Sequence, residues 1–161
     1  MKYTLSVLVE NKSGVLAHVA GLFSARGFNI DSLAVGETED PSISRMTIVG
    51  EGDERTMDQV KKQLNKLIDV IKIYDLSRIQ FIDRELMLIR VVITPKDRER
   101  VIDIVDSVRG ASVADVGDQT LTVEATGDQT MVHALIELLR PFGIKEIVRT
   151  GKIAMAINNK K

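Results

Sequence analysis

The order of the elements predicted along the chain is the same in both halves, and this order constrains the fold more than any other feature. Polar and apolar residues alternate over residues 3–10, as in a half-buried strand. The apolar residues of 15–26 recur at steps of three and four, which indicates a helix, and Gly27 stands where helices commonly end. Two strands are predicted at 29–35 and 43–49. A helix follows the cap Asp53, and a strand at 70–74 ends this half.

The second half repeats the order βαββαβ, beyond a connector at 76–83. Its elements are predicted as a strand at 85–93, a helix around 101–108, strands at 111–116 and 121–125, a helix from about 128, and strands at 144–149 and 152–157. This order is typical of the ferredoxin-like plait. We therefore predict an α+β protein with two ferredoxin-like βαββαβ domains in tandem, at residues 1–77 and 78–161.

Composition argues against several classes of protein. The 161 residues contain no apolar run near the roughly 18 that a membrane span needs, and the N-terminal residues alternate in polarity, unlike a secretory signal. We therefore expect a cytoplasmic protein without a membrane partner. The chain has no cysteine, and its two histidines are far apart in sequence, which leaves little for a metal site. The net charge of −1, from 22 basic and 23 acidic residues, argues against a nucleic-acid partner.

A plait of this kind places both helices on one face of its sheet. The opposite face and one edge strand must then be covered, or protected against pairing with another chain. The residues of the first strand that point to the opposite face, Thr4, Ser6 and Leu8, are mixed rather than charged. We therefore predict that the chain forms at least a homodimer.

The start of the first helix, within the sequence ENKSGVL, has more backbone donors than side chains to satisfy them. Ser13 is predicted to be the N-cap, and its hydroxyl can accept one amide. A capping box would place Glu or Gln three residues later, but this position is Leu16. Gly14 has no Cβ, so a small anion can approach the backbone where the helix dipole adds about half a positive charge. The stretch therefore predicts a site for a carboxylate.

The side chains around this helix start suggest an amino acid as the ligand. Asn11 offers a donor and an acceptor, for an ammonium or a carboxylate, and Val15 and Leu16 add apolar walls. Asn29 begins the second strand, and we expect it close to the end of the first strand or, in a dimer, at a neighbouring chain's site. On the residues alone an ordinary turn is the commoner case, because Asn or Ser before a helix followed by Gly is frequent loop chemistry.

The sequence NKSGVL, followed by Val19, the pair LF at 22–23 and FNI at 28–30, resembles the opening of ACT domains, small βαββαβ modules that bind amino acids. The run RGFNIDSLAVGETEDPSISRMTIVGEGDE and the start of the second half, ELMLIRV, are similar to the regulatory (small) subunits of acetolactate synthase, also called acetohydroxyacid synthase. The resemblance covers nearly the whole chain. It is strongest over residues 3–90 and rests afterwards on the layout of the elements.

This resemblance implies a subunit without chemistry of its own, which binds and activates the catalytic large subunit and confers feedback inhibition by valine or a related branched-chain amino acid. It implies no cofactor on this chain, because thiamine diphosphate, FAD and magnesium belong to the large subunit of this family. ACT modules pair side by side with the effector at their interface, which implies a homodimer or a higher oligomer. The implied effector-binding residues are Asn11, Gly14, Val15 and Leu16 of one chain, with Asn29 and Ile30 of the same chain or of its partner.

The chain departs from the ACT pattern at two places. Lys12 and Ser13 stand where many ACT domains have Pro-Gly, so the loop is expected to be less rigid. The second half reads TPKDRER at the equivalent turn and lacks the Asn-x-x-Gly element, so we expect no effector site there.

Other functions have less support from the sequence. An enzyme would need a nucleophile with its base or a convergent carboxylate pair, and no such set can be identified. An RNA-binding plait would need stacking aromatic residues in its central strand, but SRMTIVGE has none. The alternative that stays open is a stand-alone ACT-type amino-acid sensor that acts on another enzyme or regulator.

Overall fold

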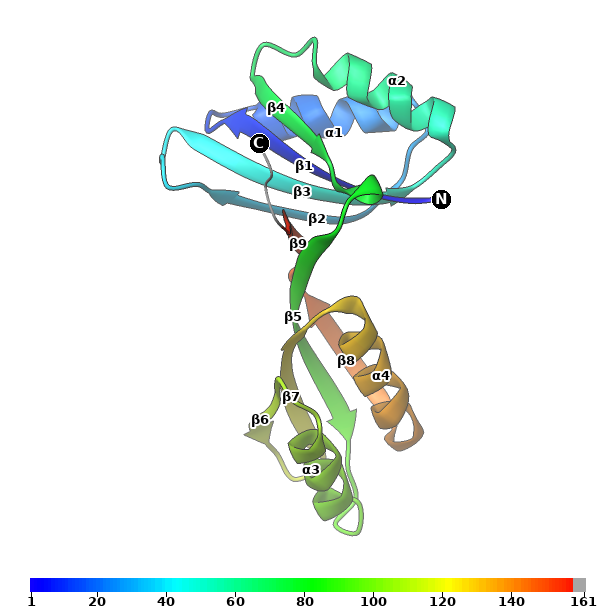
Figure 1. Cartoon of the computed structure of the whole chain (residues 1–161). Coiled ribbons are helices and arrows are strands. Elements are labelled where there is room, and N and C mark those ends of the chain that lie inside the picture. The colour runs from blue at the N-terminus through cyan, green and yellow to red at the C-terminus, as the bar shows by residue number, and fades with distance from the viewer. Residues whose placement is uncertain (158–161) are drawn as a thin grey trace. The chain divides into compact units, whose positions relative to one another are not determined.

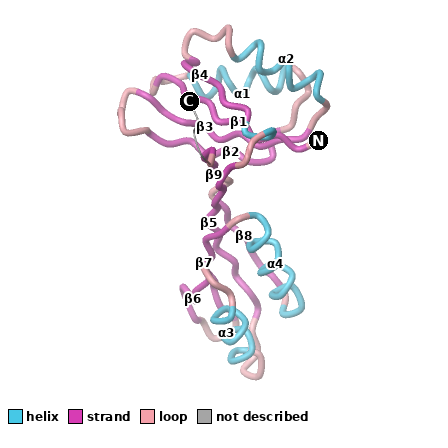
Figure 2. The backbone as a smooth tube through the Cα atoms, in the orientation of Figure 1, coloured by secondary structure: helices cyan, strands magenta, loops and turns pink. Residues whose placement is uncertain are grey.

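The computed structural model describes residues 1–157, which form two compact units (Figures 1 and 2). The first unit comprises Met1–Ile82 and the chain from Lys152 onward, and the second comprises Asp83–Gly151. The predicted fold class, α+β with two βαββαβ patterns, is confirmed. Among the described residues, no helix is long and apolar enough to cross a bilayer.

The first unit is a four-stranded antiparallel sheet with two helices on one face (Figure 1). The order of strands across the sheet is β2-β3-β1-β4, so β2 and β4 are its edges. Its elements are β1 (Lys2–Glu10), α1 (Val15–Ala25), β2 (Ile30–Glu37), β3 (Ile43–Glu51), α2 (Glu54–Leu64), β4 (Val70–Asp75) and the short 3₁₀ helix η1 (Leu76–Arg78). Figure 1 shows α1 and α2 together on one side of this sheet.

The core of the first unit lies between this sheet and its helices. The odd positions of β1, from Tyr3 to Val9, are all buried, because alternate side chains of a strand point to the same face. They pack in one cluster with the buried stripes of the helices, which are Val15, Val19 and Phe23 of α1 and Met57, Val60 and Leu64 of α2. The apolar residues that recur every two positions in the strand and every three to four positions in the helices are therefore the residues of this core.

Glycine at position 27 ends α1 as predicted. Its φ of 64° is left-handed, and its N–H donates to the carbonyl of Ser24 at 3.0 Å. The N–H of Phe28 donates to the carbonyl of Phe23 at 3.1 Å, and the two rings lie 5.4 Å apart between centroids. These two bonds and the apolar contact make a Schellman motif, which satisfies carbonyls at the helix end.

The second unit has the same architecture, with the strand order β6-β7-β5-β8. Its elements are β5 (Phe81–Val92), α3 (Arg98–Ser107), β6 (Ala111–Val116), β7 (Thr120–Gly127), α4 (Gln129–Leu139), the 3₁₀ helix η2 (Arg140–Phe142) and β8 (Ile144–Arg149). A separate cluster of buried residues from β5, β7, α3 and α4 forms its core. Strand β5 begins at residue 81, so part of the connector predicted at 76–83 is strand.

The last predicted strand, at 152–157, forms as β9 (Ile153–Ala156) and belongs to the first unit. It pairs with the beginning of β5, and the N–H of Ile157 donates to the carbonyl of Gln80 at 3.0 Å. The N–H of Lys152 also donates to the Ser32 hydroxyl of β2. The alternation of its residues predicts the strand but does not say which sheet it joins, so this placement is a finding of the structure.

Candidate functional site

The loop between β1 and α1 owes its shape to Gly14. This residue has φ 86° and ψ −13°, a left-handed conformation that glycine adopts at little cost and that other residues rarely adopt. Its carbonyl accepts the first helical bond, from the N–H of His18 at 3.0 Å, so Gly14 is the N-cap. The prediction that Ser13 is the N-cap was wrong. Among the described residues, no side chain caps this helix.

The first amides of α1 lack good hydrogen-bond acceptors among the described residues. The N–H of Val15 lies 3.5 Å from the carbonyl of Lys12, which is at the limit of a hydrogen bond. The amides of Leu16 and Ala17 have no acceptor within residues 1–157. The first turn of α1 also carries no acidic residue. These donors and the positive end of the helix dipole can therefore receive an anion.

The helices α2 and α4 begin differently. Asp53 accepts the N–H of Thr56 at 2.7 Å, and Asp128 accepts the N–H of Met131 at 2.9 Å. The bond from Thr56 holds the pKa of the Asp53 carboxyl below its usual range, as expected of a carboxylate at a helix N-terminus. In these helices a carboxylate of the chain already occupies the place that is open in α1.

The space beside Gly14 is open. A Cβ built on this glycine would meet no atom within 4 Å, so no neighbouring atom requires the residue to be small. Within the chain itself, the left-handed φ is the structural reason for glycine at this position. The basic residue of the same loop, Lys12, is already paired, because its Nζ lies 2.7 Å from Glu10 Oε2 and this bond raises the pKa of the lysine. The anion-binding capacity of the loop therefore comes from backbone amides.

Asn11 is anchored to the hairpin that joins β2 and β3. Its Nδ2 donates to the carbonyl of Pro41 at 2.9 Å and to Glu37 Oε1 at 3.3 Å, and its N–H donates to the carbonyl of Ser42 at 2.8 Å. The donors of the side chain are thus engaged, and Oδ1 remains as an acceptor. The carboxylate of Glu37 lies next to it. Asn11 is therefore suited to an ammonium group more than to a carboxylate.

The two apolar residues of the predicted site have different surroundings. Val15 is 3% exposed and packs in the core of the first unit, so it can offer a ligand only its amide. Leu16 is 46% exposed and can contact a ligand with its side chain. Of these two residues, only Leu16 has a side chain that could contribute to the predicted apolar wall.

Asn29 and Ile30 lie at the other end of the sheet, so the prediction that Asn29 is close to the end of β1 was wrong. Ile30 pairs with Gly50, whereas Glu10 pairs with Ile43. These two pairs are seven steps apart along β3, or ~23 Å at about 3.3 Å per residue. The reason is that β1 and β2 are both antiparallel to β3 and therefore run in the same direction. One chain cannot bring Asn29 and Gly14 to the same small ligand.

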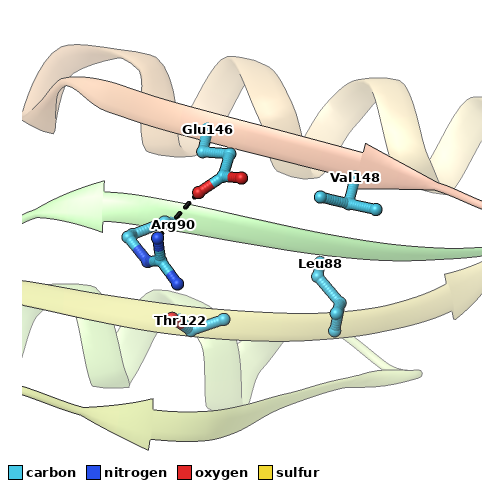
Figure 3. A pocket seen from close by; sticks show the side chains of 5 residues that line it. All are labelled: Leu88, Arg90, Thr122, Glu146 and Val148. Atoms are coloured by element: carbon cyan, nitrogen blue, oxygen red, sulfur yellow. Dashed lines mark hydrogen bonds and ion pairs between the residues drawn. The ribbon is translucent and has the colours of Figure 1, made fainter.

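The start of α3 in the second unit also has no side-chain cap, and the amides of Glu99 and Arg100 have no acceptor within residues 1–157. It differs from the start of α1 in carrying acidic residues. The N-cap of α3 is Asp97, whose carboxylate accepts the Thr94 hydroxyl at 2.8 Å, and Glu99 lies in the first turn. On the free face of its sheet, Leu88, Thr122 and Val148 line a shallow hollow with an ion pair (Figure 3). This pair joins Arg90 Nη1 to Glu146 Oε2 at 2.7 Å. The cation of this hollow is thus already neutralised.

A metal site is not apparent in the described part of the chain, where no three His, Cys, Asp or Glu residues are placed to hold an ion. Sequence reasoning missed the contacts of Asn11 with Glu37 and Pro41. The turn ETEDPS marks the hairpin in the sequence, but no periodicity shows that it folds against the loop of Asn11.

Comparison with known proteins gives consistent results over the whole chain. Residues 5–72 match the family model described as an AHAS small subunit-like ACT domain, and residues 84–158 match that of the small subunit of acetolactate synthase. A probable acetolactate synthase small subunit from Archaeoglobus fulgidus is 52% identical over 161 residues, which is 100% of both chains. An acetolactate synthase small subunit from Aquifex aeolicus is 49% identical over 156 residues, 96% of this chain and 80% of the relative.

A solved structure also resembles this chain over nearly its full length. The crystal structure of an acetolactate synthase small subunit from Thermotoga maritima superimposes with a TM-score of 0.87 and 38% identity, and the match covers 99% of each chain.

Proposed function

Because the chain belongs to the family of acetolactate synthase small subunits, we propose that it binds and activates the catalytic large subunit and makes it subject to feedback inhibition by valine or a related branched-chain amino acid. In this proposal the large subunit carries out the reaction with thiamine diphosphate, FAD and magnesium. The first unit binds the effector and dimerises, and the second unit, Asp83–Gly151, forms the second domain of the subunit.

The observation that carries the effector proposal is the start of α1, whose amides at Leu16 and Ala17 have no acceptor within residues 1–157. We assign the carboxylate of the effector to these amides. Its ammonium would lie near Asn11 Oδ1 and Glu37, which are both acceptors. The exposed side chain of Leu16 would contact the isopropyl group.

A second chain would complete the site. Strand β2 is an edge of its sheet and has one neighbour, β3, in the described part of the first unit. If two copies pair antiparallel through β2, Asn29 and Ile30 of one copy come beside the Glu37 end of the other. This end is next to Asn11 and the start of α1. The separation within one chain therefore favours a site shared between two chains of a homodimer.

Such a site would couple effector binding to the arrangement of the dimer. A ligand shifts a conformational equilibrium only by its difference in affinity between two states. An effector held by two chains meets this condition, because any change in the β2–β2 pairing moves one half of the site relative to the other. We propose that valine in this way shifts the complex toward an inhibited state.

Calorimetric titration of the isolated chain with valine, leucine, isoleucine and serine tests the effector proposal. We expect a branched-chain amino acid to bind at a ratio of one effector site per chain, and serine to bind at least about tenfold more weakly because it lacks the apolar contact with Leu16. Absence of binding by all four would refute the proposed effector site.

A stand-alone amino-acid sensor is the competing function. Purification of the chain from its own cell distinguishes the two functions, because a small subunit should bring with it a thiamine-diphosphate-dependent large subunit. Valine binding without such a partner would favour the sensor.

A further inference from the structure

The face of the first sheet that points away from α1 and α2 carries a row of basic residues. The register places Arg45 of β3 and Lys72 of β4 on either side of Leu8, and Tyr74 of β4 next to Ser6 in the adjoining row. All of these side chains share one face, because their positions alternate with the buried ones.

A cavity of about 160 Å³ lies on this face, between the sheet and β9. Its lining is Ser6, Arg45, Tyr74 and Leu76 on one side and residues 154–156 of β9 on the other. Ser6 is 1% exposed and Leu76 is also buried, so the floor is part of the folded unit. Met155, which is part of this lining, is 71% exposed, and Ile153 of the same strand is 59% exposed.

The guanidinium of Arg45 is held in place but has no counter-charge among the described residues. Its Nη1 donates to Ser6 Oγ at 2.8 Å, and its central carbon lies 5.7 Å from the centroid of the Tyr74 ring. Lys72 Nζ lies 4.9 Å from the same centroid. Within residues 1–157 no carboxylate lies within 4.0 Å of either cation, whereas Lys61 of the same unit bonds to both Asp58 and Asp75.

We propose that this surface, the β9 face formed by Arg45, Lys72, Tyr74, Ile153 and Met155, docks the catalytic subunit through an acidic side chain with apolar neighbours. The inference rests on the proposed function, since it assigns a surface to the partner named there. The carboxylate would pair with Arg45 inside the cavity. Met155 and Ile153 would cover the apolar neighbours.

The size of the cavity favours a protein side chain over a free metabolite. Pockets for small molecules commonly have volumes of roughly 300–1,000 Å³, and this cavity is well below that range. Arginine, tyrosine and methionine are enriched at the centres of protein interfaces, and arginine and tyrosine among the residues that contribute most to affinity. The exposed apolar side chains of β9, Met155 and Ile153, beside a fixed cation agree with this use.

Charge argues against two other occupants. A second copy of the chain, related by a twofold axis at this face, would bring Arg45 and Lys72 against their own copies, and like charges at an interface are repulsive. Two cations in a chain of net charge −1 are too few for a phosphate backbone. The free face of the second unit differs, because Arg90 there is already paired with Glu146 (Figure 3).

Activation of the cognate large subunit tests the proposal. The chain is titrated against a fixed amount of large subunit, and the concentration that gives half-maximal activation is measured. For Arg45→Glu we expect this concentration to rise at least about tenfold, as for an arginine that contributes strongly to an interface. The matched control is Arg55→Glu, on the exposed surface of α2, which makes the same change of charge elsewhere in the unit and should leave the value unchanged.

The second variant is Met155→Asp, which places a negative charge on the β9 face at a side chain that is mostly exposed and not needed for the core. We expect it to raise the concentration for half-maximal activation in the same way. If Arg45→Glu fails to fold, this variant tests the docking surface in its place. If a folded variant at either position gives half-maximal activation at the same concentration as the unmodified chain, the proposed docking surface is wrong. The proposed function is not affected by that result. An unmodified chain that does not activate the large subunit at any concentration would overturn the proposed function and this inference together.

Discussion

At the scale of single residues, Gly14 has two separable roles. Its left-handed φ determines the shape of the loop, and we propose that the open space and the amides beside it receive the effector. The sequence shows the glycine but not which of the two requires it. Substitutions at this position separate the roles because they change strain and charge independently.

Gly14→Ala should lower the free energy of unfolding by about 1 kcal/mol, because alanine is strained at φ 86°. The matched control is Gly21→Ala, within the same helix, where an added Cβ would also meet nothing within 4 Å but φ is not positive. This control should raise the stability by up to about 1 kcal/mol. Urea unfolding of both variants measures the difference, and a neutral Gly14→Ala would contradict the assigned strain.

Gly14→Asp should abolish valine binding and valine inhibition, because it puts a negative charge where the carboxylate of the effector is proposed to lie. Gly14→Asn is the matched control, since asparagine has nearly the same size and also tolerates a left-handed φ. We expect valine to bind Gly14→Asn much more tightly than Gly14→Asp in calorimetry. Equal affinities for both variants would show that the site is not at this loop.

At the scale of the elements, an ion pair joins α2 to the end of β4. Lys61 Nζ lies 2.9 Å from Asp75 Oδ2, and Asp75 also accepts the N–H of Ser77 at 3.0 Å. Partial burial by itself would raise the pKa of the Asp75 carboxyl, but the bonds from Lys61 and Ser77 outweigh it and hold this pKa below its usual range. The charged form of Asp75 therefore stabilises the fold.

Asp75→Asn should lower the free energy of unfolding by about 1–2 kcal/mol at pH 7. Because the pKa is lower in the folded state than in the unfolded state, this stabilisation is present above pH ~4 and is lost as pH falls further. Urea unfolding at pH 7 and pH 3 measures the change, and the difference from the unmodified chain should shrink at pH 3. The control is Asp58→Asn, the more exposed partner of Lys61, with an effect below about 0.5 kcal/mol. An equal loss at both pH values for Asp75→Asn would contradict the assignment.

The elements themselves could be predicted from the sequence, because burial imposes its period on residues such as Tyr3 to Val9 and Val15 to Phe23. Their relations in space could be predicted only in part. The sequence predicts Asn29 near the end of β1, but its true place depends on the pairing of β1 with β3 as well as on the β2–β3 hairpin. The pairing of β1 with β3 joins strands that are not consecutive in the sequence and leaves no local signal. The cavity at Arg45 was not predicted for the same reason, since residues 154–156 that close it are more than 100 positions away.

At the scale of the whole molecule, the proposed effector site requires two chains. Pairing through the edge strand β2 predicts that Val35→Lys, at a half-exposed residue of this strand, weakens dimerisation at least about tenfold and weakens valine binding with it. Ile71→Lys is the control, at a half-exposed residue of the opposite edge strand β4. Analytical ultracentrifugation measures both variants, and a Val35→Lys chain that dimerises normally would contradict pairing through β2.

The most direct test of the two-chain site mixes two variants, Gly14→Asp and Asn29→Ala, each of which we expect to lose valine binding by itself. In a mixed dimer one site carries both defects, and the other combines an intact loop with an intact Asn29. We predict that an equimolar mixture, allowed to exchange chains, regains valine binding in calorimetry at about a quarter of the original number of sites, because half of the dimers are mixed and each has one intact site. A mixture that binds no more valine than its separate components, although ultracentrifugation shows that mixed dimers form, would contradict a site shared between chains.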